Sequence, residues 1–224
     1  MPQPVPAADW HAQTYGAFGR SSTEAFENAI CTYTLLSSLG WTCQAVSAVY
    51  GNIEAESGYN PWRWEGDSVP TSTGSHSHGY GFPQFTPATK YINDVNAQAN
   101  PGYGPNYSNQ SGNLFDGDSQ LRFINDYADY YINPLYNFPT SYNDFKTDPT
   151  LTPEYLAMCW LHNYERPYDQ SSSVENYRAS VARFWYDILC QYDPAPPIPP
   201  PSADITQANK FKILFYLKPW YKRL

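Results

Sequence analysis

The sequence contains little charge and no long apolar run. Only 15% of its 224 residues are charged, and 13 Lys and Arg stand against 21 Asp and Glu, which gives a net charge of −8. Because binding to nucleic-acid phosphates requires a basic surface, this balance argues against a nucleic-acid partner. No stretch reaches the ~18 apolar residues of a membrane span, so we expect no transmembrane segment. Residues 1–10 lack the basic start and apolar core of a secretory signal.

Cysteine and histidine are also scarce. The cysteines are Cys31, Cys43, Cys159 and Cys190. They lack the close spacing of metal ligands, and we expect buried free thiols on helices, with disulfides as the alternative. His76 and His78 would share one face of an extended segment, but no third ligand stands out, so a polar loop is favoured over a metal site. We expect no cofactor, since P-loop, dinucleotide and Ser/His/Asp patterns are missing as well.

Aromatic residues, in contrast, are abundant at 17% of the chain, including 21 tyrosines and 7 tryptophans. Such rings suit sugars and protein partners at a surface, although a structurally specialised Tyr-rich protein is the alternative. Apolar periodicity and capping residues predict a mainly α body. Residues 58–86 are predicted to form loops, either alone or with a small β-hairpin. The helices are expected at 21–40 (with Ser21 and Glu24 as a capping box), 42–57, 87–98, 118–132, 152–163 and 173–191.

One carboxylate of the 42–57 helix continues an apolar stripe. Val46, Val49 and Ile53 recur at spacings of three and four, and a further step of three reaches Glu56. At ~100° per residue, Glu56 lies within about 60° of both Val49 and Ile53, whereas Glu54 points elsewhere. Partial desolvation and the negative end of the helix dipole should raise the pKa of Glu56, as a glycosidase needs in its proton donor. A side chain that reaches back to solvent from a frayed helix end is the alternative.

Three blocks of sequence form a pattern that spans about residues 23–190. The first block holds Gly40-Trp41-Thr42 and then Gly51-Asn52-Ile53-Glu54-Ala55-Glu56-Ser57-Gly58-Tyr59-Asn60-Pro61. The second runs Gly79-Tyr80-Gly81-Phe82-Pro83-Gln84-Phe85-Thr86-Pro87-Ala88-Thr89-Lys90-Tyr91. The third joins Leu156-Ala157-Met158 to Tyr164-Glu165-Arg166-Pro167. Together the three blocks resemble the phage tail lysozyme family. Their order makes the match specific, although any one of them alone would be weak.

The resemblance implies a lysozyme-like fold, mainly α (α+β), with a small β or loop lobe after the catalytic helix. It implies cleavage of the β-1,4 bond between N-acetylmuramic acid and N-acetylglucosamine in bacterial peptidoglycan. The family's catalytic acid maps onto Glu56. By analogy with related wall-cleaving enzymes, Tyr80 and Gln84 lie near the sugar, Thr86 supports them and Tyr164 contacts substrate.

A second catalytic group is less evident. A hydrolase requires a carboxylate that activates water or attacks the sugar, and Glu65 and Asp67 are the candidates on the loop that faces the cleft. Both could instead be solvated loop charges. Water held by Gln84 or Thr86 could then serve, or the 6-hydroxyl of the substrate could attack and form an anhydro-sugar. For Glu165 and Arg166 we favour an ion pair that fixes the corner of the third block.

The sequence departs from the family pattern at several positions. Glu54 stands where the family commonly has Gln, and its orientation argues against a shared role with Glu56. Pro83 and Phe85 replace the commoner Val and Trp, which changes the expected shape of the sugar subsite. The segment 65–78 is unusually long.

The expected organisation is a lysozyme-like catalytic domain between two appendages. An arm covers 1–20, the catalytic domain 21–192, a stiff proline-rich linker 193–202 and a basic-aromatic tail 203–224. The tail could bind phage tail or other virion proteins, or a membrane or wall surface, or the acidic body. We expect a protein that is made in the host cytoplasm, carried in the virion tail and active on the host wall. Alternatives are a lytic transglycosylase, a lysis-stage endolysin and a non-catalytic peptidoglycan-binding tail protein.

Overall fold

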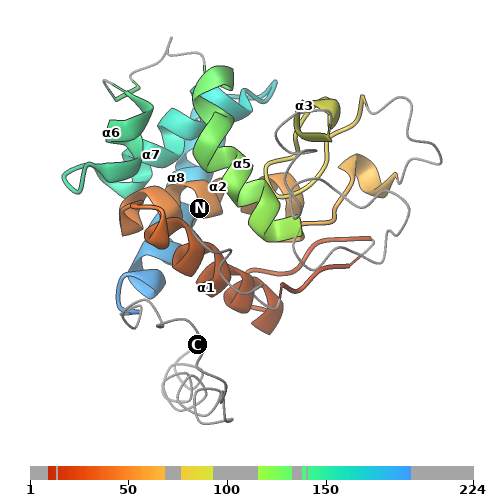
Figure 1. The fold of residues 1–224 in the computed structure, drawn as a ribbon, viewed down its shortest axis with the longest axis horizontal. Helices are drawn as coiled ribbons and strands as arrows, with labels where there is room; N and C mark the ends of the chain where they lie inside the picture. Colours follow the sequence, from red (N-terminus) through yellow and green to blue (C-terminus); the bar gives the residue numbers. More distant parts are fainter. Residues whose placement is uncertain are drawn as a thin grey trace, which may run out of the picture. The chain divides into compact units, whose positions relative to one another are not determined.

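A computed structural model describes residues 10–13, 15–68, 77–92, 116–132, 138–139 and 141–192. This part of the chain is mostly helical, which confirms the mainly α fold class. The elements are α1 (Thr23–Ser38), α2 (Cys43–Ser57), a 3-10 turn (Glu65–Asp67), α3 (Thr89–Ile92), α5 (Asp116–Tyr131), α6 (Tyr142–Thr147), α7 (Pro153–Trp160), a π-helical turn (Leu161–Glu165) and α8 (Ser172–Leu189). Figure 1 shows them in chain order.

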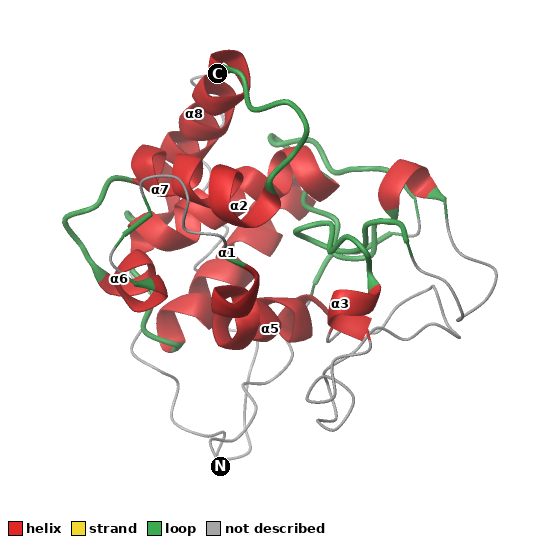
Figure 2. Cartoon of the chain, turned by 90° about the horizontal axis from the view of Figure 1, so that it is seen from above, coloured by secondary structure: helices red, strands yellow, loops and turns green. Residues whose placement is uncertain are grey.

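Helix α2 lies at the centre of the helical body. It packs most extensively against α8 and then α7, with α1 and α6 also in contact (Figures 1 and 2). Gly51 of α2 sits against Ala182 of α8 so closely that a Cβ at Gly51 would come 2.7 Å from the Ala182 backbone nitrogen. The absence of a side chain at Gly51 therefore allows the two helices to approach each other closely, and this sets the position of the carboxyl end of α2.

The ends of α2 are those that the sequence predicts. Thr42 is the N-cap, and its hydroxyl accepts a hydrogen bond from the Ala45 N–H at 3.2 Å. Gly58 ends the helix in the left-handed conformation, with φ at 57°. For α1, the prediction of Ser21 as the cap is wrong by one residue. Ser22 caps that helix instead, because its side chain accepts from the Ala25 N–H.

The predicted β-hairpin does not form within the described residues after α2. Residues 58–68 and 77–88 contain turns, the 3-10 turn and two isolated bridges, Trp64 with Tyr80 and Tyr80 with Phe85 (Figure 2). Gln120 of α5 holds two of these loops together, accepting from the Phe82 N–H at 2.6 Å and donating to the Pro61 carbonyl at 2.7 Å. The lobe is therefore organised by turns and by side-chain contacts to α5.

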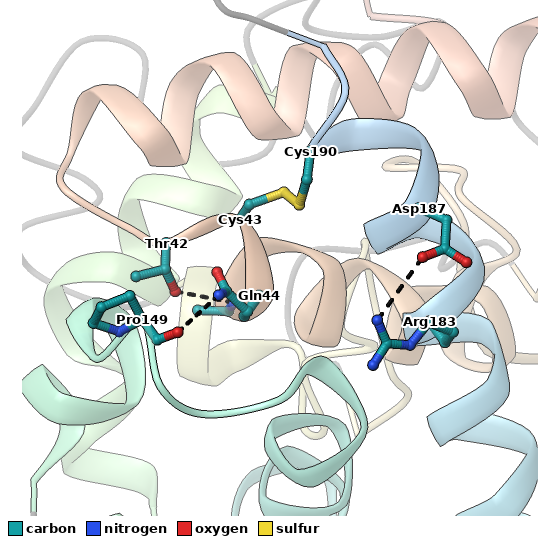
Figure 3. Close-up of a disulfide and its surroundings, with 8 residues drawn as sticks. Thr42, Cys43, Gln44, Pro149, Arg183, Asp187 and Cys190 are labelled. Carbon is teal, nitrogen blue, oxygen red and sulfur yellow. Dashed lines mark hydrogen bonds and ion pairs between the residues drawn. A yellow bond between two sulfur atoms is a disulfide. The ribbon is translucent and has the colours of Figure 1, made fainter.

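The expectation of four free thiols is wrong. A disulfide joins Cys43, at the start of α2, to Cys190, just after α8, with the Cα atoms 5.8 Å apart (Figure 3). Cys31, which is partly buried, and Cys159, which is buried, are not part of this disulfide. The error arose because the two bonded cysteines are 147 residues apart in sequence. Only the packing of α2 on α8 brings them together.

Several predictions lie outside the described residues. They are the arm up to residue 9, the end of the 87–98 helix, His76, the proline-rich linker and the basic-aromatic tail. The long helices of the body agree with the predicted ones to within two residues at most ends. Helix α6 was missed, since its six residues are too few for a clear apolar period. Among the described residues, none of the helices is long and apolar enough to cross a membrane.

Candidate active site

A cavity of about 370 Å³ opens beside the carboxyl end of α2. It is bounded by the loop after α2, the second sequence block, α3 and the turn that follows α7. The lining residues are Glu56, Glu65, Pro83, Gln84, Phe85, Thr86, Lys90, Tyr164, Glu165, Arg166, Pro167 and Tyr168. All three blocks of the sequence analysis therefore contribute to one cavity.

Glu56 is held in this cavity by an arginine of α8. Its carboxylate accepts from Arg178 Nη2 at 2.5 Å, and the Glu56 side chain is 18% exposed. Arg178 Nη1 donates to the Asn52 carbonyl at 2.5 Å, so the guanidinium is fixed to α2 at two points. Arg178 is itself almost fully buried. The Glu56 side chain thus lies neither in an apolar core nor fully in solvent. Arg178, the residue that positions it, is 122 residues away in the sequence.

Glu54 points away from the cavity, as the helical spacing predicts. It accepts two hydrogen bonds from Arg20, both at 2.6 Å, and further bonds from the hydroxyls of Tyr59 and Tyr177. Although burial opposes ionisation, the bonds from Arg20, Tyr177 and Tyr59 together lower the pKa of Glu54 below its usual value. This carboxylate joins the segment before α1 to α2 and α8, which is a structural role.

Gln84 and Thr86 both line the cavity, and they support each other. The Thr86 hydroxyl donates to the Gln84 carbonyl at 2.8 Å, while the Gln84 amide donates to the carbonyls of Arg63 and Gly81 at 3.0 Å each. Gly79 is required beside them, because a Cβ there would lie 2.9 Å from both side-chain oxygens. Tyr80, however, is not among the lining residues. It is 5% exposed and packs on Trp64 with ring centroids 4.6 Å apart.

The two loop carboxylates occupy different places. Glu65 lines the cavity, and its side chain accepts from the Gly79 N–H at 2.8 Å and is 59% exposed. Asp67 is not among the lining residues. It accepts from the Gly16 N–H at 2.8 Å and lies 3.5 Å from Arg63 Nε, so it fastens the segment before α1 to this loop.

The turn after α7 brings two further side chains to the cavity. Tyr164 stacks on Trp160 with ring centroids 4.1 Å apart, and Glu165 accepts from the Trp160 indole N–H at 2.7 Å. The π-helical turn that carries both residues ends at Arg166, which has a left-handed backbone with φ at 50°. Such turns often occur at functional sites.

The predicted ion pair between Glu165 and Arg166 does not form. Within the described residues, the side chain of Glu165 forms a hydrogen bond with Trp160 instead. Enclosure by protein and the nearby Glu56 carboxylate raise the pKa of Glu165 well above its usual value, against the opposing effects of the Trp160 hydrogen bond and of Arg178 and Lys90. The sequence placed this residue in the third block without revealing that it lines the same cavity as Glu56.

Metal ligands do not gather at this site. Within the residues that the structure describes, no group of three or more His, Cys, Asp or Glu side chains could hold a metal ion.

The arrangement defines a mainly α protein with an acidic, aromatic-lined cavity at the end of its central helix. A model of the phage tail lysozyme family matches residues 27–189, and the chain belongs to that family. Membership of this family agrees with the mainly α fold and with the cavity at the end of the central helix.

The chain is also similar to a curated phage protein. It is 32% identical over 173 residues to morphogenesis protein 1 of Bacillus phage B103, an alignment that covers 75% of this chain and 41% of the relative. The chain thus spans about two fifths of the length of that relative.

Proposed function

We propose that the protein cleaves the β-1,4 bond between N-acetylmuramic acid and N-acetylglucosamine, with Glu56 as the catalytic acid. The observation that carries this proposal is the position of Glu56 in the cavity, where Arg178 fixes its carboxyl group. A volume of about 370 Å³ lies within the usual range of small-ligand sites. The site therefore suits a few sugar rings of a glycan strand rather than a large apolar ligand.

The polar side chains along the cavity support this substrate. Gln84 and Thr86 can form hydrogen bonds with sugar hydroxyl or acetamido groups, and the Tyr164 ring offers an aromatic face to a pyranose. We propose that Tyr80 acts from behind, by holding the loop through its packing on Trp64. Sequence reasoning put Tyr80 beside the sugar, and its burial favours this supporting role.

Bond cleavage requires a proton at the glycosidic oxygen and stabilisation of the positive charge that develops on the sugar ring. Glu56 is placed to donate the proton to the glycosidic oxygen. Glu65, on the cavity wall, can attack the anomeric carbon or activate water, and water bound near Gln84 can attack that carbon as well. Asp67 is less suited to that role, since its contacts are with Gly16 and Arg63 outside the cavity.

We further propose that the protein acts from the virion tail and opens the host wall locally during entry, with residues 203–224 binding other virion proteins. Family membership and the similarity to a morphogenesis protein support a virion-associated role. Detection of the protein in purified virions would support this placement. Its presence only in lysates at the time of lysis would favour an endolysin.

The direct test is mass spectrometry of muropeptides released from purified cell walls. Wild type should release fragments with reducing N-acetylmuramic acid ends, and Glu56→Gln should release them about 100- to 10,000-fold more slowly, the usual effect of losing a general acid. Glu54→Gln is the matched control, two residues away on the same helix and outside the cavity lining. It should leave the identity of the products unchanged.

Other products would change the proposal. Anhydro-muramic ends would indicate a lytic transglycosylase that uses the same glutamate. A wild type that pellets with walls but releases nothing would refute catalysis and leave a peptidoglycan-binding tail protein.

A further inference from the structure

Besides Glu56 and Glu65, the cavity holds a carboxyl group to which the sequence analysis gave no catalytic role. Glu56 reaches it from the end of α2 and Glu165 from the turn after α7. The two groups are supported differently. Arg178 supplies a positive charge to Glu56 at 2.5 Å, whereas Glu165 accepts one hydrogen bond from the neutral indole of Trp160.

The charges that face Glu165 come from three helices. Glu56 on α2 opposes its ionisation, and Arg178 on α8 and Lys90 on α3 favour it. Lys90 holds its positive charge less firmly than an ordinary lysine. Burial, and then the nearby Arg166, lower the pKa of Lys90, and Glu165 partly offsets this effect. Burial of Glu165 and the negative charge of Glu56 both raise the pKa of Glu165. Together they exceed the lowering effects of Arg178 and Lys90, so this pKa lies well above its usual value. Two carboxyl groups that line one small cavity disfavour each other's negative charge.

We propose that Glu165 is a second catalytic carboxyl group and that Glu56 and Glu165 share a single proton in the resting enzyme. In the resting enzyme the proton resides on Glu165, because Arg178 stabilises the Glu56 carboxylate, and during cleavage Glu56 delivers it to the glycosidic oxygen. This inference rests on the proposed glycoside cleavage. It explains how the site can hold a proton for the leaving group even though Glu56 is paired with Arg178.

The chemical step balances with water as the only co-reactant. The bond between the anomeric carbon and the glycosidic oxygen breaks, its electron pair remains on the oxygen, and the proton of the pair moves to that oxygen. The pair is then doubly negative, which stabilises the positive charge on the sugar ring. Water forms a bond from its oxygen to the anomeric carbon, and its surplus proton returns to the pair.

Glu65 is less suited to hold this proton. Its side chain is 59% exposed, and it accepts a hydrogen bond from the Gly79 N–H. Glu65 can therefore contact substrate or water, whereas Glu165 is half-buried and is held by the Trp160 indole.

The kinetic test compares wild type with Glu165→Gln, Glu56→Gln and the double variant on purified walls. Gln can still accept the Trp160 hydrogen bond through its amide oxygen, so the turn should keep its fold. Turnover should fall about 100-fold or more in each single variant, with sedimentation on walls unchanged. Because the pair acts as a unit, the double variant should be little slower than the slower single variant. Glu154→Gln is the control, since Glu154 pairs with Arg183 outside the cavity lining and should keep wild-type turnover.

The second test follows the glutamate side-chain carboxyl carbons by NMR during a pH titration. In wild type, Glu165 should titrate well above the ~4.3 of an ordinary glutamate. Glu56→Gln removes the like charge and should shift the titration of Glu165 toward lower pH. This titration tests the shared proton, and the loss of turnover in Glu165→Gln tests whether Glu165 takes part in catalysis.

The outcomes separate the two proposals. An active wild type with an equally active Glu165→Gln would overturn the pair and leave the proposed function intact. Titration of Glu165 at an ordinary pH, unchanged by Glu56→Gln, would also overturn the pair. A wild type that cleaves no glycan would refute the proposed function and the catalytic role of Glu165 with it.

Discussion

Removal of the disulfide between Cys43 and Cys190 should destabilise the protein without changing its site. The bond lies at the start of α2, whereas Glu56 lies at the other end of that helix. Around the bond, Gln44 donates to the Pro149 carbonyl at 3.0 Å and Arg183 pairs with Asp187 (Figure 3). These contacts do not depend on the sulfur atoms. We therefore expect the double variant Cys43→Ser/Cys190→Ser to fold into the same structure.

The size of the effect follows from the length of chain that the bond closes. For a separation of 147 residues, the loop-entropy relation gives a stabilisation of about 5 kcal/mol at 25 °C. Measured values for single disulfides are commonly ~2–4 kcal/mol, because reduced chains retain some structure. We expect a loss of about 2–5 kcal/mol in the free energy of unfolding.

Urea unfolding of wild type and the double variant, each with and without reductant, measures this loss. Reductant should lower the midpoint of wild type to that of the double variant and should leave the double variant unchanged. Mass spectrometry after alkylation of the oxidised protein in denaturant should find two reactive thiols rather than four. The argument is refuted if the bond is present by mass and its reduction changes the free energy of unfolding by less than about 1 kcal/mol.

Two other substitutions test the packing of α2. Gly51→Ala should lower stability by about 1–3 kcal/mol despite the greater helix propensity of alanine, because the new Cβ would lie 2.7 Å from a backbone nitrogen of α8. Thermal unfolding would measure this, and Gly19→Ala, with no atom within 4 Å of the added Cβ, is the control that should be nearly neutral. Glu54→Gln should destabilise the protein near neutral pH, where the carboxylate is paired with Arg20. Since the pKa of Glu54 is lowered on folding from its ordinary 4.5, this contribution is present above about that pH and is lost as the pH falls through the folded-state pKa. The difference in melting temperature between wild type and Glu54→Gln should accordingly shrink between pH 5 and pH 3, and a constant difference would argue against the pair.

Local signals in the sequence were sufficient to predict α2. Thr42 and Gly58 mark its ends through side-chain and backbone preferences that act within a few residues. The apolar stripe also distinguishes Glu56 from Glu54, and the structure places only Glu56 in the cavity. The loops were harder to predict, because Glu65 and Asp67 have similar sequence surroundings and their different contacts depend on Gly79 and Gly16, which come from other segments.

Contacts between distant segments account for most of what was missed. Arg178 lies 122 residues after Glu56 and was counted only among the residues of a long helix. Its spacing from Val174 and Val181 places it near the buried face of α8, and a buried arginine requires a partner. That signal could have indicated a nearby carboxylate, but not which one. Similarly, Glu165 was recognised in the third block, whereas its proximity to Glu56 depends on the turn after α7.

Helices α2 and α8 run antiparallel and are fastened at both ends, by the disulfide at one end and by Glu56 with Arg178 at the other. The covalent bond closes a ring of chain that includes every lining residue of the cavity, from Glu56 to Tyr168. A single proteolytic cut anywhere between Cys43 and Cys190 would therefore leave both fragments attached to each other. An oxidised protein nicked outside a cell could keep its two halves together, and on a denaturing gel the nick would become visible only after reduction.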